Sequence, residues 1–178
     1  KLGSYTNSLM YYFMGEPFLN KKSYEMIRYA KDIGIPFITT CTNGDPVNPE
    51  KLIKCGLDEV SFQIGGMTQE THEIYRINSN LERVLTALKE TIRLKKEHNS
   101  KIRVMAGFIV MKHNEHEIEN FQNHMAELGV DGITVINPCV RNISQGEQFL
   151  PENKRYWDYD VEAFKNGNLK PIIQPRNK

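Results

Sequence analysis

Short apolar runs alternate with helix-like segments over most of the chain, and this alternation limits the fold to one broad class. Strands that are separated by helices form a parallel sheet with right-handed crossovers. The pattern therefore predicts an α/β fold with a parallel sheet, which is either an open doubly wound sheet or part of a barrel. A complete eight-stranded barrel takes roughly 250 residues. A chain of 178 residues holds at most a partial barrel.

The bounds of the segments follow from turn residues and from residues that favour helix ends. The run 10–14 is aromatic and apolar, and Gly15-Glu16-Pro17 closes it, which predicts a buried strand that ends at Gly15. Asn114 and Glu117 have the spacing of a capping box at a helix start. We expect strands over 10–14, 37–42, 59–64, 101–111 and 132–137, and helices over 23–34, 48–55, 68–76, 80–98 and 114–129.

The alternation stops after Pro138. Residues 141–149 are polar and predict a loop, residues 151–164 predict a helix, and residues 171–175 suit a short strand. We therefore divide the chain into a barrel core over 1–140 and a loop, helix and connector over 141–178.

Small and polar residues stand where the expected strands end, at Gly15-Glu16, Asn43, Ser61, Gln63 and Asn137. Ligands of parallel α/β folds bind at this carboxyl edge. Serine, asparagine and glutamine suit ribose hydroxyls or amides, and glycine lets a ligand approach the backbone. The sequence has no glycine-rich phosphate loop. The edge therefore favours a nucleoside-like ligand over a polyphosphate, with ordinary turn chemistry as the alternative.

Few residues offer catalytic chemistry of their own. Arg76 is placed near the loop after the third strand, either as a solvated helix end or as the partner of a carboxylate. No serine has an evident base, and no lysine is central in a strand. Four histidines fall in helical stretches, where surface or capping roles are expected, and three cysteines lack metal-ligand spacing and suggest buried apolar side chains. These are His72, His98, His116 and His124, and Cys41, Cys55 and Cys139.

An ordered set of motifs from Leu9 to Asn137 resembles the core of radical S-adenosylmethionine enzymes, particularly those with a SPASM-type accessory domain. The specificity lies in the order and spacing of the pieces. They are Phe13-Met14-Gly15-Glu16-Pro17-Phe18-Leu19, Thr42-Asn43-Gly44, Gly56-Leu57-Asp58-Glu59-Val60-Ser61-Phe62, Gln63-Ile64-Gly65-Gly66, Thr71-His72-Glu73-Ile74-Tyr75-Arg76 and Leu128-Gly129-Val130-Asp131.

The resemblance implies a partial TIM-like (β/α)₆ barrel that binds S-adenosylmethionine. In such enzymes a [4Fe-4S] cluster reduces the cofactor to give a 5′-deoxyadenosyl radical, which abstracts hydrogen from a substrate. It also implies roles for eight residues. Gly15 and Glu16 would contact the methionyl amino group of the cofactor. Ser61 and Gln63 would lie near its ribose or carboxylate, and Arg76 would pair with the carboxylate. Asn43, Val110 and Asn137 would lie close to the cofactor or the substrate.

The chain departs from the family pattern in two places. The cluster motif Cys-x-x-x-Cys-x-x-Cys should precede Gly15 by a few dozen residues, and the fourteen residues before Gly15 contain no cysteine. The family often has Ser-x-Asp-Gly where this chain has Gln63-Ile64-Gly65-Gly66, so an acidic group is lost. We therefore expect a piece of a longer enzyme that lacks the first β/α unit. Residues 170–178 would lead to a missing SPASM-like domain, the cluster ligands would lie outside this chain, and the piece alone would be inactive.

Two other readings remain open from the sequence. One is a non-catalytic binding or interaction module that has lost the cluster, and the other is a cofactor-free lyase or aldolase of partial-barrel type. A net charge of +1 and the lack of a long apolar run predict neither a nucleic-acid nor a membrane partner. We expect a cytoplasmic protein with a peptide or small-molecule substrate, and an exposed sheet edge that favours self-association.

Overall fold

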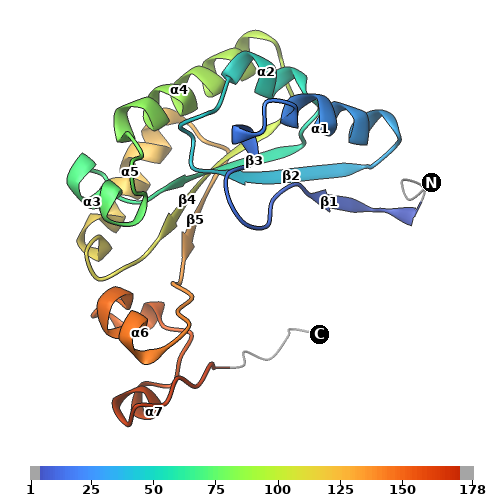
Figure 1. The fold of residues 1–178 in the computed structure, drawn as a ribbon. Helices are drawn as coiled ribbons and strands as arrows, with labels where there is room; N and C mark the ends of the chain where they lie inside the picture. The colour runs from blue at the N-terminus through green and yellow to red at the C-terminus, as the bar shows by residue number, and fades with distance from the viewer. Residues whose placement is uncertain (1–4, 173–178) are drawn as a thin grey trace.

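The computed structural model describes residues 5–172, which form one parallel sheet with helices along it (Figure 1). The strands lie in the order β1-β2-β3-β4-β5, and each pairs in parallel with the next. A doubly wound sheet reverses its strand order, whereas sequential order in one direction is the winding of a barrel wall. The α/β class and the partial barrel are therefore confirmed. The strands are β1 (Ser8–Met10), β2 (Phe37–Thr42), β3 (Glu59–Ile64), β4 (Arg103–Ile109) and β5 (Gly132–Ile136).

The helices follow the strands in turn, and most of their bounds agree with the prediction. Asn48 and Asn80 each accept a hydrogen bond from the backbone of the first helical turn, and Gly129 ends a helix at a φ of +77°. The helices are α1 (Ser23–Asp32), α2 (Pro49–Lys54), α3 (Gln69–Tyr75), α4 (Leu81–Glu97), α5 (Ile118–Leu128), α6 (Ile143–Phe149) and α7 (Val161–Lys165). In the part of the chain that the structure describes, none of them combines the length and apolarity needed to cross a membrane.

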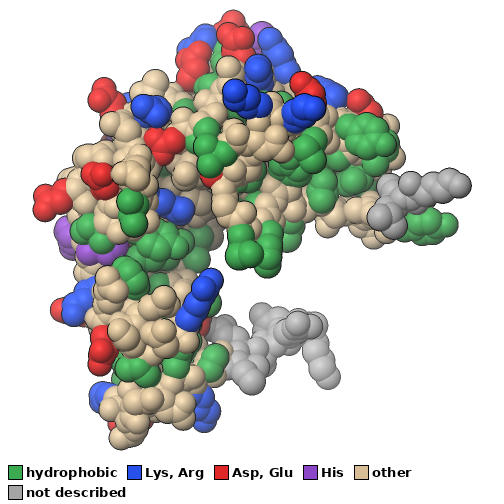
Figure 2. Space-filling view, in the orientation of Figure 1, with side chains coloured by type: hydrophobic (Ala, Val, Ile, Leu, Met, Phe, Trp, Pro, Cys, Tyr) green, Lys and Arg blue, Asp and Glu red, His purple; other side chains and the backbone are tan. Residues whose placement is uncertain are grey.

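The sheet buries one face and leaves the other open. Along β3, Val60, Phe62 and Ile64 are buried in the main core, while Ser61 and Gln63 are half-buried on the opposite face. Helices α1, α2 and α4 lie along the buried side (Figure 1). In the space-filling view, a hollow separates the β1 edge from the part of the chain that holds α6 and α7 (Figure 2). The open face is the wall of this hollow.

The expected buried strand over 10–14 is wrong in both extent and burial. Strand β1 ends at Met10, and the last backbone bond to β2 runs from Tyr11 N to Thr39 O at 2.7 Å. Phe13 and Met14 are 90% and 79% exposed. The reason is that β1 pairs with β2 alone and the chain then leaves the sheet, so nothing among the described residues covers these side chains.

The expected capping box at Asn114 and Glu117 is also wrong. The segment begins with a 3₁₀ turn, Glu115–Glu117, and Asn114 makes no side-chain cap. Instead, the Asn114 amide bonds Met111 N, Gly65 O and Ile109 O, and Glu117 accepts from Met67 N and Thr71 Oγ1. Both side chains are buried. They join the loops after β3 and β4, because those backbone groups need partners where the chain turns away from the sheet.

Residues 143–149 form helix α6, so the loop expected over 141–149 is wrong. Asn142 caps this helix by accepting from Gln145 N at 2.9 Å. The helix expected over 151–164 is reduced to a 3₁₀ turn, Lys154–Tyr156, and α7. A second, small core lies here, formed by Val140, Leu150, Trp157 and Tyr159. Of the strand expected over 171–175, Pro171 forms one bridge with Tyr159, and residues 173–178 lie outside the described residues.

Candidate functional site

Glu16 fixes the loop after β1 to the end of β2. Its Oε1 accepts from Phe18 N at 3.1 Å and from Thr42 Oγ1 at 2.8 Å, and its Oε2 accepts from Asn43 N at 2.7 Å. A carboxylate has about four acceptor positions. Three are used here, so Glu16 holds two loops together and keeps acceptor capacity for one more donor.

Ser61 and Gln63 stand side by side on the open face of β3. The Gln63 amide donates to Ser61 Oγ at 2.8 Å, so the two polar groups partly satisfy each other without a ligand. Gly107 on β4 is paired with Gln63, and a Cβ atom there would lie 2.5 Å from the Gln63 amide nitrogen. The lack of a side chain at Gly107 therefore leaves the room that the Gln63 amide occupies.

Two predicted ligand residues hold buried polar atoms without hydrogen-bond partners among the described residues. They are Asn43 Oδ1 and Arg76 Nε. Such atoms are rare in folded proteins, since each costs free energy unless water or a ligand satisfies it. His113 Nε2 and His124 Nε2 share this state. Among these four atoms, only those of Asn43 and Arg76 belong to residues predicted to bind the cofactor.

Arg76 ends helix α3 and lies over the loop that follows β3. Burial is the main cause that lowers the pKa of its guanidinium, and Tyr75, Glu16 and Cys41 oppose that effect. The Arg76 stem lies against Gly65 at the end of β3, which is the neighbour of β2 in the sheet. Glu16 bonds the backbone of Asn43 at the end of β2, so the three residues stand at adjacent strand ends of the carboxyl edge.

The remaining predicted residues are placed differently. Gly15 is exposed at a φ of +85°, where side chains are strained. Val110 is fully buried and contributes its side chain to the main core, and its backbone N–H donates to Ile136 O. Asn137 donates to Asp158 Oδ1 at 2.8 Å, which ties the end of β5 to the C-terminal segment. The structure therefore gathers the loop residues after β1 and β2 with Arg76, and leaves the Val110 side chain apart from them.

A cavity of about 350 Å³ lies at the carboxyl ends of β4 and β5, against α6. Its walls are mostly apolar, and they include the residue before Arg76. Lining residues are Tyr75, Ile109, Ile136, Asn137, Arg141 and Phe149. This volume is within the range of small-molecule sites, and its position places it next to the region around Arg76.

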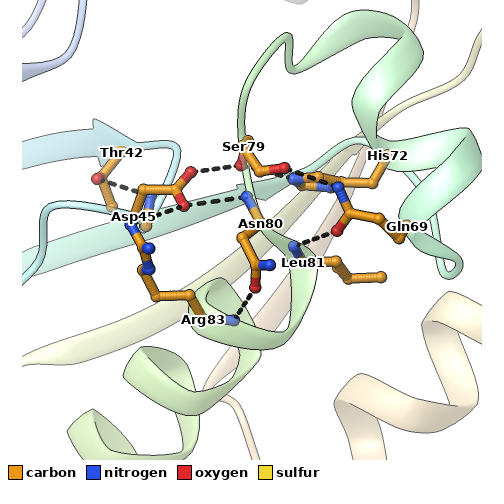
Figure 3. A network of polar contacts seen from close by, with 9 residues as sticks. Thr42, Asp45, Gln69, His72, Ser79, Asn80, Leu81 and Arg83 are labelled. Atoms are coloured by element: carbon orange, nitrogen blue, oxygen red, sulfur yellow. Dashed lines mark hydrogen bonds and ion pairs between the residues drawn. The ribbon is translucent and has the colours of Figure 1, made fainter.

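The sequence interpretation missed a buried hydrogen-bond network behind Arg76. His72, expected at a helix surface or cap, is fully buried, so that expectation is wrong. Its Nδ1 accepts from Gly65 N at 3.1 Å, and its Nε2 contacts Ser79 Oγ at 2.8 Å (Figure 3). Ser79 in turn bonds Asp45. The network joins the loops after β2, β3 and α3 around the imidazole. The sequence signal that could have indicated it is Gly65-Gly66, because the lack of side chains there allows α3 to approach the end of β3.

The described residues contain no group of three or more histidine, cysteine, aspartate or glutamate side chains that could hold a metal ion. Of the cysteines, Cys55 is buried as expected, whereas Cys41 is half-buried and Cys139 is exposed. The chain has three cysteines in all and no Cys-x-x-x-Cys-x-x-Cys motif. These residues therefore do not fit a [4Fe-4S] cluster.

Comparison with known proteins links this geometry to one family. The sequence model of the Radical SAM superfamily matches residues 6–125. A probable GTP 3′,8-cyclase of Sulfurisphaera tokodaii is 28% identical over 125 residues, which cover 68% of this chain and 38% of that protein. The AdoMet-dependent heme synthase of Methanosarcina barkeri is 28% identical over 169 residues, with coverages of 90% and 46%. The chain spans less than half the length of both relatives.

Solved structures share the fold at low sequence identity. The structure of native anSMEcpe with bound AdoMet matches with a TM-score of 0.54 at 14% identity and covers 96% of this chain and 51% of that one. The structure of 2,3-dimethylmalate lyase matches with a TM-score of 0.52 at 12% identity and covers 77% and 52%. Since a lyase shares the fold almost equally well, the backbone alone does not separate these classes, and the sequence match to the family does.

Proposed function

The chain belongs to the radical SAM superfamily, and from this premise we propose that the carboxyl edge of its sheet binds S-adenosylmethionine. The observation that carries the proposal is the pair of unpartnered buried atoms, Asn43 Oδ1 and Arg76 Nε. One is an acceptor and the other is a donor, and their residues stand at the adjacent ends of β2 and β3. A ligand that brings both donor and acceptor groups would satisfy them.

The groups of S-adenosylmethionine match this set of donors and acceptors. Its carboxylate suits the Arg76 guanidinium, which is a charge-assisted interaction. Its ammonium group suits the free acceptor capacity of Glu16 and the exposed backbone at Gly15, and a ribose hydroxyl suits Asn43 or the Ser61–Gln63 pair. Each group of this chain then binds or orients the cofactor, and none of them supplies acid–base chemistry.

The radical chemistry of this superfamily depends on a [4Fe-4S] cluster, and the three cysteines of these 178 residues do not have the spacing of its ligands. S-adenosylmethionine, bound next to a reduced [4Fe-4S] cluster, supplies chemistry that abstracts hydrogen from a substrate. Because the three cysteines are far apart and two of them are partly or fully buried, we propose that the cluster ligands come from outside these 178 residues. The contribution of this chain is then to position the cofactor and to form a wall of the substrate site.

The substrate stays unassigned within this proposal. The relatives are named for a GTP cyclase and a heme synthase, two different reactions, and their identities of 28% do not carry either one over. The cavity at the ends of β4 and β5 is the proposed substrate side, because it is lined by Tyr75, the residue before Arg76, and is large enough for a small molecule.

Binding measurements test the proposal directly. We expect the protein to bind S-adenosylmethionine, and we expect Arg76→Gln to weaken binding at least about tenfold, since a hydrogen bond to a charged group is lost. Arg93→Gln is the matched control, because Arg93 pairs with Glu90 and Glu97 on the outer surface of α4. Wild-type protein that does not bind the cofactor, or equal affinities for the two variants, would contradict the proposal.

A further inference from the structure

The hydrogen bonds that link Gly65, His72, Ser79 and Asp45 can have only one arrangement of donors and acceptors. The Gly65 N–H is a fixed donor, so His72 Nδ1 must be the acceptor and the ring proton must lie on Nε2. The Nε2–H then donates to Ser79 Oγ, and the Ser79 hydroxyl donates to Asp45 Oδ2. Every donor in the chain meets an acceptor, and Figure 3 shows its course from Asp45 to His72. The neutral imidazole with its proton on Nε2 is the form that satisfies all three bonds.

At its other end, this series of hydrogen bonds reaches the backbone next to Arg76. The Arg76 N–H donates to His72 O at 3.0 Å, and a Cβ atom on Gly65 would lie 3.0 Å from both Arg76 Cγ and His72 O. The Arg76 side chain therefore lies against the space that Gly65 leaves free. If Gly65 moves, the stem of Arg76 loses the surface on which it rests, and the guanidinium moves with it.

From these contacts we propose that Asp45, Ser79 and His72 are positioning residues: Asp45 and Ser79 fix the His72 ring, and the ring holds Gly65 and Arg76 in place for the cofactor. The inference rests on the proposed binding function for its purpose, but its physical content, the tautomer and the position of Arg76, can be measured without any ligand.

The charges around His72 support the neutral form. Burial is the main cause that lowers the His72 pKa, and the nearby Arg76 cation lowers it further, while Asp45 and Glu73 oppose these effects. Asp45 also faces Arg83, whose Nη1 lies 4.0 Å from Oδ1. A proton added to Nδ1 would set two donors against each other at the Gly65 contact and place a second positive charge beside Arg76.

The isosteric variant Asp45→Asn tests how Asp45 holds the imidazole. The asparagine Oδ1 can still accept from Asn80 N, as Asp45 Oδ1 does at 3.1 Å. Its amide NH₂ would then face Ser79 Oγ and donate to it, so the Ser79 hydroxyl proton loses its acceptor. Ser79 Oγ can still accept from His72 Nε2–H, because a hydroxyl oxygen has two lone pairs, and the Gly65 N–H still requires Nδ1 as its acceptor. The ring proton therefore stays on Nε2, while the bond that fixes Ser79 and the ring is lost.

The readouts are nitrogen NMR of the His72 ring, the Arg76 Nε–H resonance and the affinity for S-adenosylmethionine. We expect wild-type protein at neutral pH to carry the proton on Nε2. Asp45→Asn should keep that tautomer, shift the Arg76 resonance and weaken cofactor binding about tenfold, the loss of one hydrogen bond. Arg83→Gln is the control: it removes the charge opposite Asp45 but none of the three bonds, and it should keep the tautomer and bind within about twofold of wild type.

The outcomes separate this inference from the proposed function. An Asp45→Asn protein with an unchanged Arg76 resonance would overturn the positioning role, whatever it binds. Wild-type protein that does not bind S-adenosylmethionine would overturn the proposed function, while the two NMR readouts would still decide the positioning role. If Asp45→Asn does not fold, the wild-type tautomer decides: a ring proton on Nδ1 refutes the inference.

Discussion

Asn114 offers the sharpest test of how the carboxyl edge is held together. Its side chain is 1% exposed and makes three hydrogen bonds, to Met111 N at 2.7 Å, Gly65 O at 2.8 Å and Ile109 O at 3.0 Å. Asn114→Ala removes all three. Each lost bond costs about 1 kcal/mol, and the buried Met111 N–H, left without this acceptor, adds about another 1 kcal/mol. We expect the free energy of unfolding to fall by about 3–4 kcal/mol.

Urea unfolding of wild type and variant measures this loss, with Asn48→Ala as the matched control. Asn48 makes one exposed cap bond, to Lys51 N at 3.0 Å, and its removal should cost about 1 kcal/mol. A second variant, Asn114→Asp, keeps the acceptor for Met111 but sets an oxygen against two carbonyls. It should therefore be least stable at neutral pH and recover on acidification, when the carboxyl group becomes a donor.

The reasoning fails if Asn114→Ala costs no more than Asn48→Ala. It fails also if Asn114→Asp is as stable as wild type at pH 7, because that result would mean that the two carbonyls do not need the amide protons.

Two further predictions concern protons and iron. Burial lowers the pKa of His72 and of His113 in the folded protein, so the unfolded chain binds more protons below the ordinary histidine value of about 6.5. The free energy of unfolding should have its full value above that pH and should fall as the pH is lowered through it. Urea titrations at pH 7.5, 6.5 and 5.5 that show no fall in this free energy would contradict the prediction. Anaerobic reconstitution of the 178-residue chain should leave no stoichiometric [4Fe-4S] cluster, as iron and sulfide analysis would show, and one cluster per chain would refute the absence of ligands.

Most of the scaffold could be predicted because its signals are local. The bounds of β2 and β3 agree with the sequence prediction, since each is a short run of strand-forming residues closed by Asn43-Gly44 or Gly65-Gly66. The caps at Asn48 and Asn80 were likewise predictable, because a side chain and its partner are three residues apart. Such features need no knowledge of the rest of the chain.

The failures share a different cause, which is a partner distant in the sequence. Asn114 and Glu117 have the pattern of a capping box, but their partners Gly65 and Met67 lie about 50 positions earlier. His72 lies in a helical segment like a surface residue, and it is buried because Asp45 and Ser79 close over it. In the candidate site, the residue types at strand ends were predictable from the sequence. That Asn43 Oδ1 and Arg76 Nε are buried without hydrogen-bond partners could be seen only in the structure.

The one-sided burial of the sheet also bears on how this protein can change over time. The residues that stabilise β3, such as Val60 and Phe62, point away from the hollow, and those that face it, such as Ser61 and Gln63, contribute little apolar burial. Substitutions of Ser61 and Gln63 therefore cost less folding free energy than those of Val60 and Phe62, while they change the surface of the wall. The proposed ligand contacts can then diverge during evolution without loss of the apolar core, because the opposite row continues to stabilise the sheet.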